Sequence, residues 1–186
     1  LFCNPGLITP SCSAGILQPM RIAIVTDAWA PQVNGVVTTL TRTSETLRGF
    51  GHEVSVVHPG AFRTFPCPSY PEIRLAWRPF SGVARRLEEI SPDRIHIATE
   101  GPLGLAARRY CLRRRLRFTT SYHTQFPQYL RARAPVPLAV SFAFLRWFHG
   151  GAARTMVATQ RQREELRARR FENLGAWTRG VDTQLF

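Results

Sequence analysis

Short apolar runs alternate along this chain with longer amphipathic segments, and this alternation is the main indication of its fold. The first unit predicts a buried strand near residues 21–26, because its apolar positions follow one another within strand length. Residues 36–47 then repeat apolar positions at near-helical spacing. Between them lies a loop that ends in Asn34-Gly35, where both residues tolerate turn conformations. The unit therefore reads as strand, loop and helix.

The same alternation continues to the end of the chain. Further strands are expected at residues 53–58, 73–76, 93–98, 117–121, 155–158 and 174–177, and further helices at 80–90, 101–115, 136–150 and 160–170. The segment 62–71, rich in Pro and aromatic residues, is expected to be a loop. Repeated strand–helix units with short connections predict an α/β, Rossmann-like parallel sheet with helices on both faces.

Residues 1–19 differ from the rest of the chain. They carry no charge, contain three Pro and two Gly, and precede the pair Met20-Arg21. They lack the basic start and continuous apolar core of a signal peptide. We expect a disordered extension at 1–19, one domain over 20–178, and no membrane-spanning helix, which needs roughly 20 apolar residues.

The charge of the chain is basic and unevenly distributed. All 25 basic residues are Arg, with nine Arg against eight acids in residues 1–100 and sixteen against four in residues 101–186. A basic surface suits anionic lipid head groups or phosphates, and solvated helix faces are the alternative. The densest cluster includes Arg108, Arg109, Arg113 and Arg114. RNA binding is disfavoured, because only Tyr110 supplies an aromatic ring there.

Missing motifs argue against a dinucleotide-dependent oxidoreductase and against a P-loop enzyme. No G-x-G-x-x-G follows the first strand, no Walker A motif is possible without Lys, and no G-x-S-x-G occurs. The five His residues are scattered, and the four Cys residues show no paired spacing. We therefore expect no metal site and a reduced, cytoplasmic protein.

Polar residues follow three of the predicted strands at their carboxyl ends, where parallel sheets bind ligands. These are Asp27, the pair Thr99-Glu100, and the pair Tyr122-His123. His123 suits hydrogen bonding to a sugar hydroxyl, or is an ordinary surface or core histidine. Glu100 could bind the hydroxyl groups of a ligand, although capping the helix that begins at Pro102 is the simpler role.

The Asn34-Gly35 pair opens the first helix and offers a second kind of site. Free amide groups in a first helical turn favour an anion, and Gly allows a phosphate to approach the backbone. The alternative is a tight turn that only feeds the helix.

Taken in order, these motifs resemble the N-terminal half of family 4 glycosyltransferases. The resemblance covers about residues 20–186 and lies closest to the GDP-mannose-dependent α-mannosyltransferases and the sulfoquinovosyl- and glucosyl-lipid synthases. The matching motifs are Met20-Arg21-Ile22-Ala23-Ile24-Val25, Pro31-x-x-Asn34-Gly35-Val36, Gly51-His52-Glu53-Val54, Glu100-Gly101-Pro102-Leu103-Gly104, Tyr122-His123-Thr124-x-Phe126 and Arg179-Gly180-Val181-Asp182-x-x-x-Phe186.

The resemblance implies one domain of a GT-B enzyme, which retains the anomeric configuration and needs no metal. It implies that Asn34 and Gly35 approach the donor diphosphate and that His123, the catalytic residue, contacts the donor sugar. Asp27, Glu100 and Tyr122 would then lie on the acceptor side. A nucleotide sugar and a lipid or glycan acceptor are the implied partners, with the basic helices resting on the inner face of the plasma membrane.

One departure from the family pattern concerns the donor. In the family, the contacts to the donor come mainly from a second domain and include a Glu-x7-Glu pair; that domain would follow residues 179–186. Glu164 and Glu172 have that spacing, but they lie in an Arg-rich segment and are expected to be surface residues. We therefore expect a half-enzyme without transferase activity alone; a nucleotide-sugar 2-epimerase half and a non-catalytic basic module are the alternatives.

Overall fold

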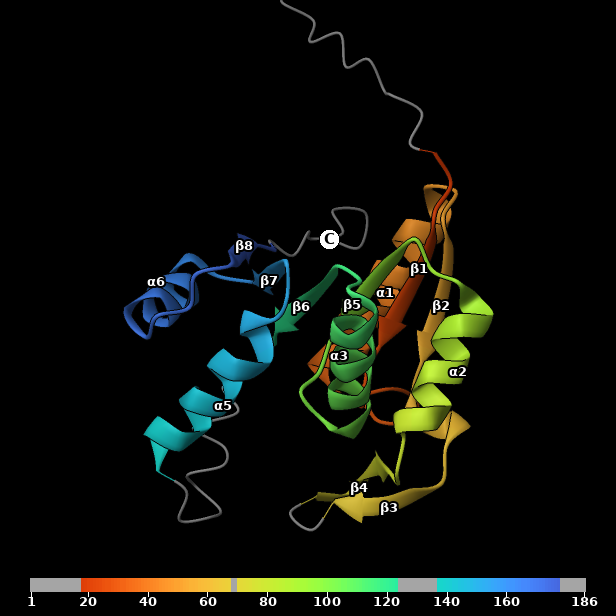
Figure 1. Ribbon diagram of the computed structural model, residues 1–186, viewed down its shortest axis with the longest axis horizontal. Helices are drawn as coiled ribbons and strands as arrows, with labels where there is room; N and C mark the ends of the chain where they lie inside the picture. The colour runs from red at the N-terminus through yellow and green to blue at the C-terminus, as the bar shows by residue number, and fades with distance from the viewer. Residues whose placement is uncertain (1–17, 68–69, 124–136, 178–186) are drawn as a thin grey trace, which may run out of the picture.

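The chain folds around one parallel sheet, as the sequence predicts. The computed structural model describes residues 18–67, 70–123 and 137–177. The sheet runs in the order β2-β1-β5-β6-β7-β8 (Figure 1). Its strands are β1 (Arg21–Val25), β2 (Glu53–Val57), β5 (Arg94–Ile97), β6 (Phe118–Tyr122), β7 (Arg154–Val157) and β8 (Leu174–Ala176).

The helices cover the two faces of the sheet unequally. They are α1 (Gly35–Gly49), α2 (Phe80–Ile90), α3 (Pro102–Arg114), α5 (Leu138–Gly150) and α6 (Gln160–Ala168). Ala23 and Val25 of β1 pack with α2 and α3, whereas Ile22 and Ile24 face Leu40 of α1. The strand register carries the first face on to α5 and α6. Among the described helices, α1 alone covers the opposite face.

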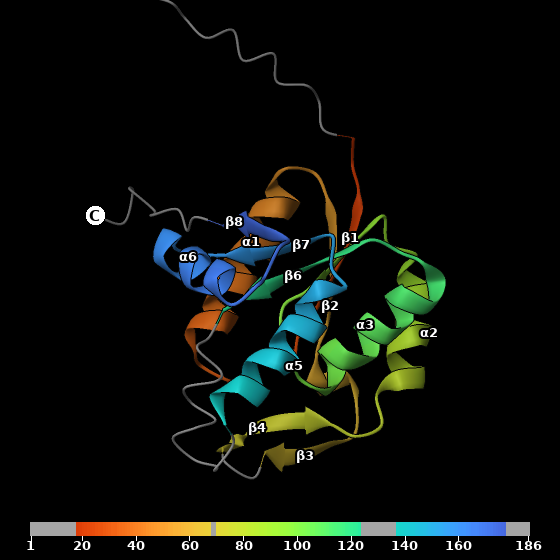
Figure 2. The ribbon, with the colours of Figure 1, turned by 60° about the vertical axis from the view of Figure 1, so that its left-hand side comes forward.

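The segment after β2 departs from the prediction. A short 3-10 turn, η1 (Pro59–Ala61), leads into an antiparallel hairpin of β3 (Thr64–Cys67) and β4 (Tyr70–Ala76). This hairpin lies beneath α2, α3 and α5, apart from the main sheet (Figure 2). The loop expected at 62–71 was therefore wrong. A two-stranded ribbon has two free edges, so it accepts Pro66, which normally argues against a strand.

The order of the strands places a topological switch point at β1. This strand pairs with β2 on one side and with β5 on the other. The ladders continue past the strand ends, because Thr26 N donates to the Val57 carbonyl and Ala98 N to the Val25 carbonyl. The loops after β1 and β5 are therefore neighbours, as the sequence predicts, and such a crevice is where open α/β sheets bind ligands.

Three predicted features lie outside the described residues. They are most of the extension at 1–19, the end of the motif after His123 and the crossing at 179–186. No described helix is long and apolar enough to cross a membrane.

Candidate functional site

Asp27 lies two residues after the end of β1 and is only 6 % exposed. Its carboxylate accepts hydrogen bonds from the amide of Leu103 at 2.9 Å and from the amide of Gly104 at 3.4 Å. It also accepts one from the Thr99 hydroxyl at 2.9 Å, and that hydroxyl in turn accepts from the Asp27 amide at 2.7 Å. Asp27 thus caps the start of α3 and joins the loops after β1 and β5.

Opposing effects act on the charge of this carboxyl group. Burial raises the pKa of Asp27 to about 6, although the hydrogen bonds from Leu103, Thr99 and Gly104 favour the ionised form. The nearby charge of Glu100 raises this pKa further. Asp27 is therefore placed to change protonation state just below neutral pH.

Two glycines allow this close approach. A Cβ atom on Gly101 would lie 2.4 Å from Cγ of Asp27, and one on Gly104 would lie 1.9 Å from the carbonyl oxygen of Thr99. Both distances are far below van der Waals contact. The two Gly residues of the Gly-Pro-Leu-Gly motif are thus required by packing against Asp27 and Thr99.

Glu100 does not cap α3, because Asp27 fills that role. Instead, Oε1 of Glu100 lies 3.2 Å from Nε2 of His149, at the end of α5. His149 is fully buried, and its Nδ1 lies 2.9 Å from the hydroxyl of Thr120. This pair could not be predicted from the sequence, because the two residues are far apart along the chain and His149 is one of several scattered histidines.

Tyr122 and His123 point toward different faces of the sheet. Tyr122 is 5 % exposed and packs with Phe142 and Leu145 beneath α5. Burial, together with the charge of Glu100, raises the pKa of Tyr122 to about 12. The His123 ring lies 5.2 Å from the ring of Trp177, beyond β8. The described contacts give Tyr122 a packing role, and its expected contact with a sugar stays a prediction.

His123 belongs to a cluster of rings on the α1 face. His96 on β5 makes an edge contact with Trp177 at 5.6 Å. Its ring nitrogens lie 2.8 Å from the Thr119 hydroxyl and 3.2 Å from the Ser121 hydroxyl. Burial and then the charge of His123 lower the pKa of His96 to about 3, so this ring is neutral at physiological pH. His96 and Trp177 were not among the predicted site residues, although both lie on predicted strands.

Asn34 caps α1 with its own side chain. Its carbonyl oxygen accepts from the amides of Val36 and Val37, both at 3.0 Å. Gly35 begins the helix, and a Cβ atom there would meet nothing within 4 Å. The space in front of Gly35 is therefore open. The side-chain oxygen of Asn34, however, already accepts from two of the backbone N–H groups that an anion would use.

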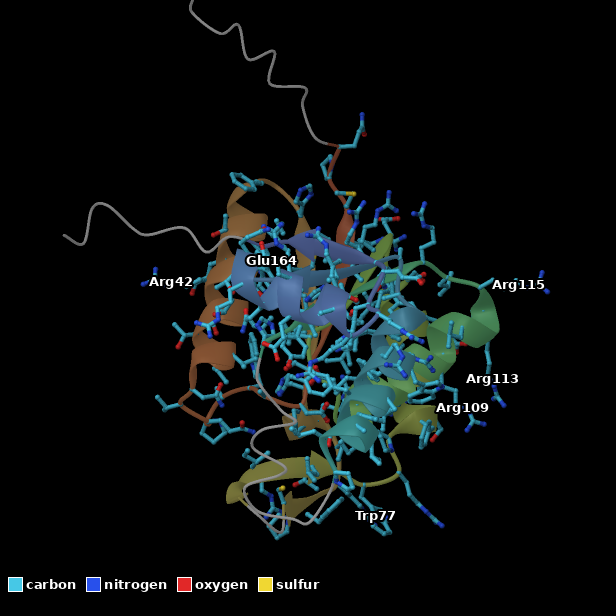
Figure 3. The ribbon with its side chains drawn as sticks, turned by 90° about the vertical axis from the view of Figure 1, so that its left-hand side faces the viewer. Arg42, Trp77, Arg109, Arg113, Arg115 and Glu164 are labelled. Carbon is cyan, nitrogen blue, oxygen red and sulfur yellow. The ribbon has the colours of Figure 1, made fainter. Side chains whose placement is uncertain are left out.

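The four arginines expected at a membrane differ in their surroundings. Arg108 donates to the carbonyl oxygens of Phe148 at 2.9 Å and Trp147 at 2.8 Å, which ties α3 to the end of α5. Arg114 pairs with Glu88 of α2. Arg109 and Arg113 project away from the sheet, as does the neighbouring Arg115 (Figure 3).

The described residues contain no group of three His, Cys, Asp or Glu side chains that could hold a metal ion. Glu164 lies on the surface of α6 (Figure 3) and accepts a hydrogen bond from Gln160. Glu172 is also exposed, as expected for both residues of this pair.

Comparison with known proteins identifies relatives over most of the chain. It is 30 % identical to a GDP-mannose-dependent alpha-mannosyltransferase of Corynebacterium glutamicum, over 92 % of this chain and 46 % of the relative. The enzyme of the same name from Mycobacterium tuberculosis is 28 % identical, over 90 % of this chain and 49 % of the relative. An alpha-monoglucosyldiacylglycerol synthase of Acholeplasma laidlawii is 31 % identical, over 59 % and 31 %.

The chain thus spans about half the length of the mannosyltransferases that it matches. The model of Glycosyltransferase Family 4 matches residues 33–185, which include the start of α1, the capped start of α3 and the ring cluster around His123. On this evidence, the chain belongs to Glycosyltransferase Family 4.

Proposed function

We propose that this chain forms the acceptor-side domain of a retaining GT-B glycosyltransferase. The enzyme would move a hexose, mannose in the first instance, from a nucleotide sugar to a lipid or glycan acceptor. The observation that carries the proposal is the joining of the polar loops after β1 and β5 through Asp27 and Thr99 at the switch point. The names of the relatives support the choice of donor and acceptor classes.

Within this proposal, the donor side is formed by residues near the α1 face. His123 would contact the donor sugar, because it follows β6 at the carboxyl edge of the sheet and is positioned by Trp177 and the neutral His96. Asn34 and Gly35 would approach the diphosphate, which has open space in front of Gly35. An imidazole beside a departing diphosphate can stabilise developing charge through a hydrogen bond.

The acceptor side would be formed by Asp27 and Glu100, with Tyr122 packed beneath them. Asp27 and Glu100 place two carboxyl groups beside the start of α3. Carboxylate oxygens accept hydrogen bonds from sugar or lipid hydroxyl groups. This pair would orient the attacking hydroxyl, while Tyr122 supports the loop from beneath.

The first experiment compares this chain with the product of its complete reading frame, which the half-enzyme proposal requires to be a longer protein. Each is incubated with radiolabelled GDP-mannose and a membrane lipid extract, and transfer is measured. We expect transfer only by the longer protein, since the donor contacts would come mainly from its second domain. Transfer by the chain alone would refute the half-enzyme reading. Failure of the longer protein with every nucleotide sugar tested would refute the proposed activity.

His123→Ala in the longer protein tests the assignment of the site. We expect turnover to fall by more than tenfold, the usual scale for a lost transition-state hydrogen bond. Unchanged turnover would remove His123 from the reaction. We also propose that the reaction needs no metal, so EDTA should leave the rate of transfer unchanged.

A peripheral membrane contact is a second part of the proposal. A groove of about 490 Å³ between α2 and α3 is lined by Phe80, Tyr110, Arg109 and Arg113, among other residues. Arg109 and Arg113 point outward from it (Figure 3). Guanidinium groups beside aromatic rings, of which Phe80 is exposed, suit the head-group region of an anionic bilayer.

Charge reversal at Arg109 and Arg113 tests this contact. Binding to vesicles of phosphatidylglycerol and phosphatidylcholine should fall at least tenfold, at about 1 kcal/mol for each basic residue near the surface. Arg42→Glu is the matched control, because Arg42 is exposed on α1, away from α3 (Figure 3). Equal binding by all variants would show that the basic face is only solvated. Arg108 and Arg114 are left unchanged, because their contacts hold helices together.

A further inference from the structure

A line of buried polar groups leads from the middle of the sheet to Glu100. The hydroxyls of Thr155 on β7 and Thr120 on β6 lie 3.1 Å apart. The Thr120 hydroxyl lies 2.9 Å from Nδ1 of His149, and Nε2 of His149 lies 3.2 Å from Oε1 of Glu100. Thr155, Thr120 and His149 are fully buried. Four groups from β7, β6, α5 and the loop after β5 thus form one connected series.

The surroundings of His149 are apolar, so its polar contacts matter energetically. Its ring makes edge or tilted contacts with Phe148 at 5.1 Å, Tyr122 at 6.2 Å and Phe171 at 6.3 Å. A buried polar group without a partner costs about 1–3 kcal/mol. An aromatic hydrocarbon would fill this site without that cost, so the imidazole needs a reason beyond packing.

The direction of the hydrogen bonds follows from the number of protons. Each hydroxyl has one proton to donate, and a neutral imidazole has one. If Thr155 donates to Thr120 and Thr120 donates to Nδ1, then the proton of a neutral His149 ring lies on Nε2, which is 3.2 Å from Oε1 of Glu100. The reverse direction would place the bare Nε2 opposite a carboxylate oxygen, and both would be acceptors. The series therefore ends in a polar contact with Glu100, although neither Nε2 of His149 nor Oε1 of Glu100 makes a hydrogen bond of regular geometry with a described residue.

Only part of Glu100 is accessible. Its side chain is 10 % exposed, while Oε1 is fully buried against His149. A ligand at the carboxyl edge must therefore meet the carboxyl group through its other oxygen. Glu100 also lies directly before Gly101, the first residue of the capped start of α3. Both the backbone and one carboxylate oxygen of Glu100 are thus fixed.

We propose that His149 is a positioning residue for the acceptor: held by Thr120 and Thr155, it fixes one oxygen of Glu100 so that the other accepts a hydrogen bond from the acceptor hydroxyl. This inference rests on the proposed function. It assigns to α5 a part in the site that the loops at the sheet edge do not reveal. It also explains why hydroxyl residues occupy fully buried positions in β6 and β7.

His149→Phe in the longer, transfer-competent protein tests the proposal. This change keeps a ring of similar size but removes the ring nitrogen that contacts Glu100. We expect kcat/KM for the acceptor to fall at least tenfold, mainly through KM, while KM for the nucleotide sugar stays unchanged. His149→Gln should recover most of the loss, because its amide N–H group can take the place of Nε2 beside Glu100. His52→Phe is the matched control: His52 is also buried but lies at the opposite edge of the sheet, where it accepts from the Met20 amide.

A double-mutant cycle separates positioning from stability. Glu100→Gln should lower the same acceptor parameter, and adding His149→Phe to it should cause little further loss, because both changes break one interaction. Thr155→Val, which keeps the shape of the side chain, should give a smaller loss of the same kind if His149→Phe folds poorly. A role in stability alone would lower the melting temperature and leave KM for the acceptor unchanged.

The outcomes distinguish this inference from the proposed function. Acceptor kinetics of His149→Phe equal to those of His52→Phe, with an active wild-type protein, would overturn the inference alone. Full additivity of the His149 and Glu100 changes would also overturn it. Absence of any sugar transfer by the wild-type protein would overturn the proposed function and this inference with it.

Discussion

The buried carboxyl group of Asp27 gives the sharpest test of the electrostatics in this domain. Its pKa rises from the ordinary value of 3.8 to about 6, because burial outweighs three hydrogen bonds that favour the charge. The difference corresponds to about 3 kcal/mol, at 1.36 kcal/mol for each pKa unit. Asp27→Asn removes the titrating group and keeps a side chain of nearly the same shape.

The sign of the effect follows from proton linkage. Between pH 3.8 and about 6 the folded state holds the proton on Asp27 more tightly than the unfolded state does. The free energy of unfolding therefore decreases as pH rises through this window, and the Asp27 contribution is constant outside it. Relative to Asp27→Asn, the free energy of unfolding of the wild-type chain should rise by about 3 kcal/mol as the pH falls from about 7 to about 3.

Urea unfolding at several pH values, followed by circular dichroism, measures this difference. Asp93→Asn removes an accessible carboxylate from the same chain and controls for the change in net charge. A wild-type stability that falls relative to Asp27→Asn on acidification would refute the reasoning. It would mean that the hydrogen bonds from Leu103, Gly104 and Thr99 outweigh burial and hold the pKa low.

Two other predictions concern how α3 is held in place. Gly104→Ala should destabilise the domain by more than about 3 kcal/mol, because its Cβ would lie 1.9 Å from a backbone oxygen. The control Gly49→Ala places its Cβ in open space and should be neutral or slightly stabilising. Equal melting temperatures of the two variants would contradict the close approach at Gly104. Arg108→Ala should lower the free energy of unfolding by about 1–3 kcal/mol, because it leaves two carbonyl groups at the end of α5 without their donor. The control Arg113→Ala removes an outward-pointing side chain and should change stability little. Equal losses of thermal stability would show that the Arg108 contacts do not stabilise the fold.

The sequence determined most of the architecture. The order of strands and helices and the edge at which Asp27 and Thr99 meet were predicted, because apolar periodicity and Gly or Pro breaks act within a few residues. The hairpin of β3 and β4 was not predicted, because its Pro residues argue locally against strands and its pairing depends on two separate segments.

The tertiary structure decided which side chains meet. The register of β5, β6 and β7, together with the packing of α5, brings His149 to Glu100 and Thr120. The same packing leaves the α3 cap to Asp27, 76 residues away from Leu103. A sequence pattern reports the conformation and burial of its own segment, but the partner of a polar side chain depends on which distant segment packs beside it. The chemistry of the candidate site is therefore a property of the folded domain.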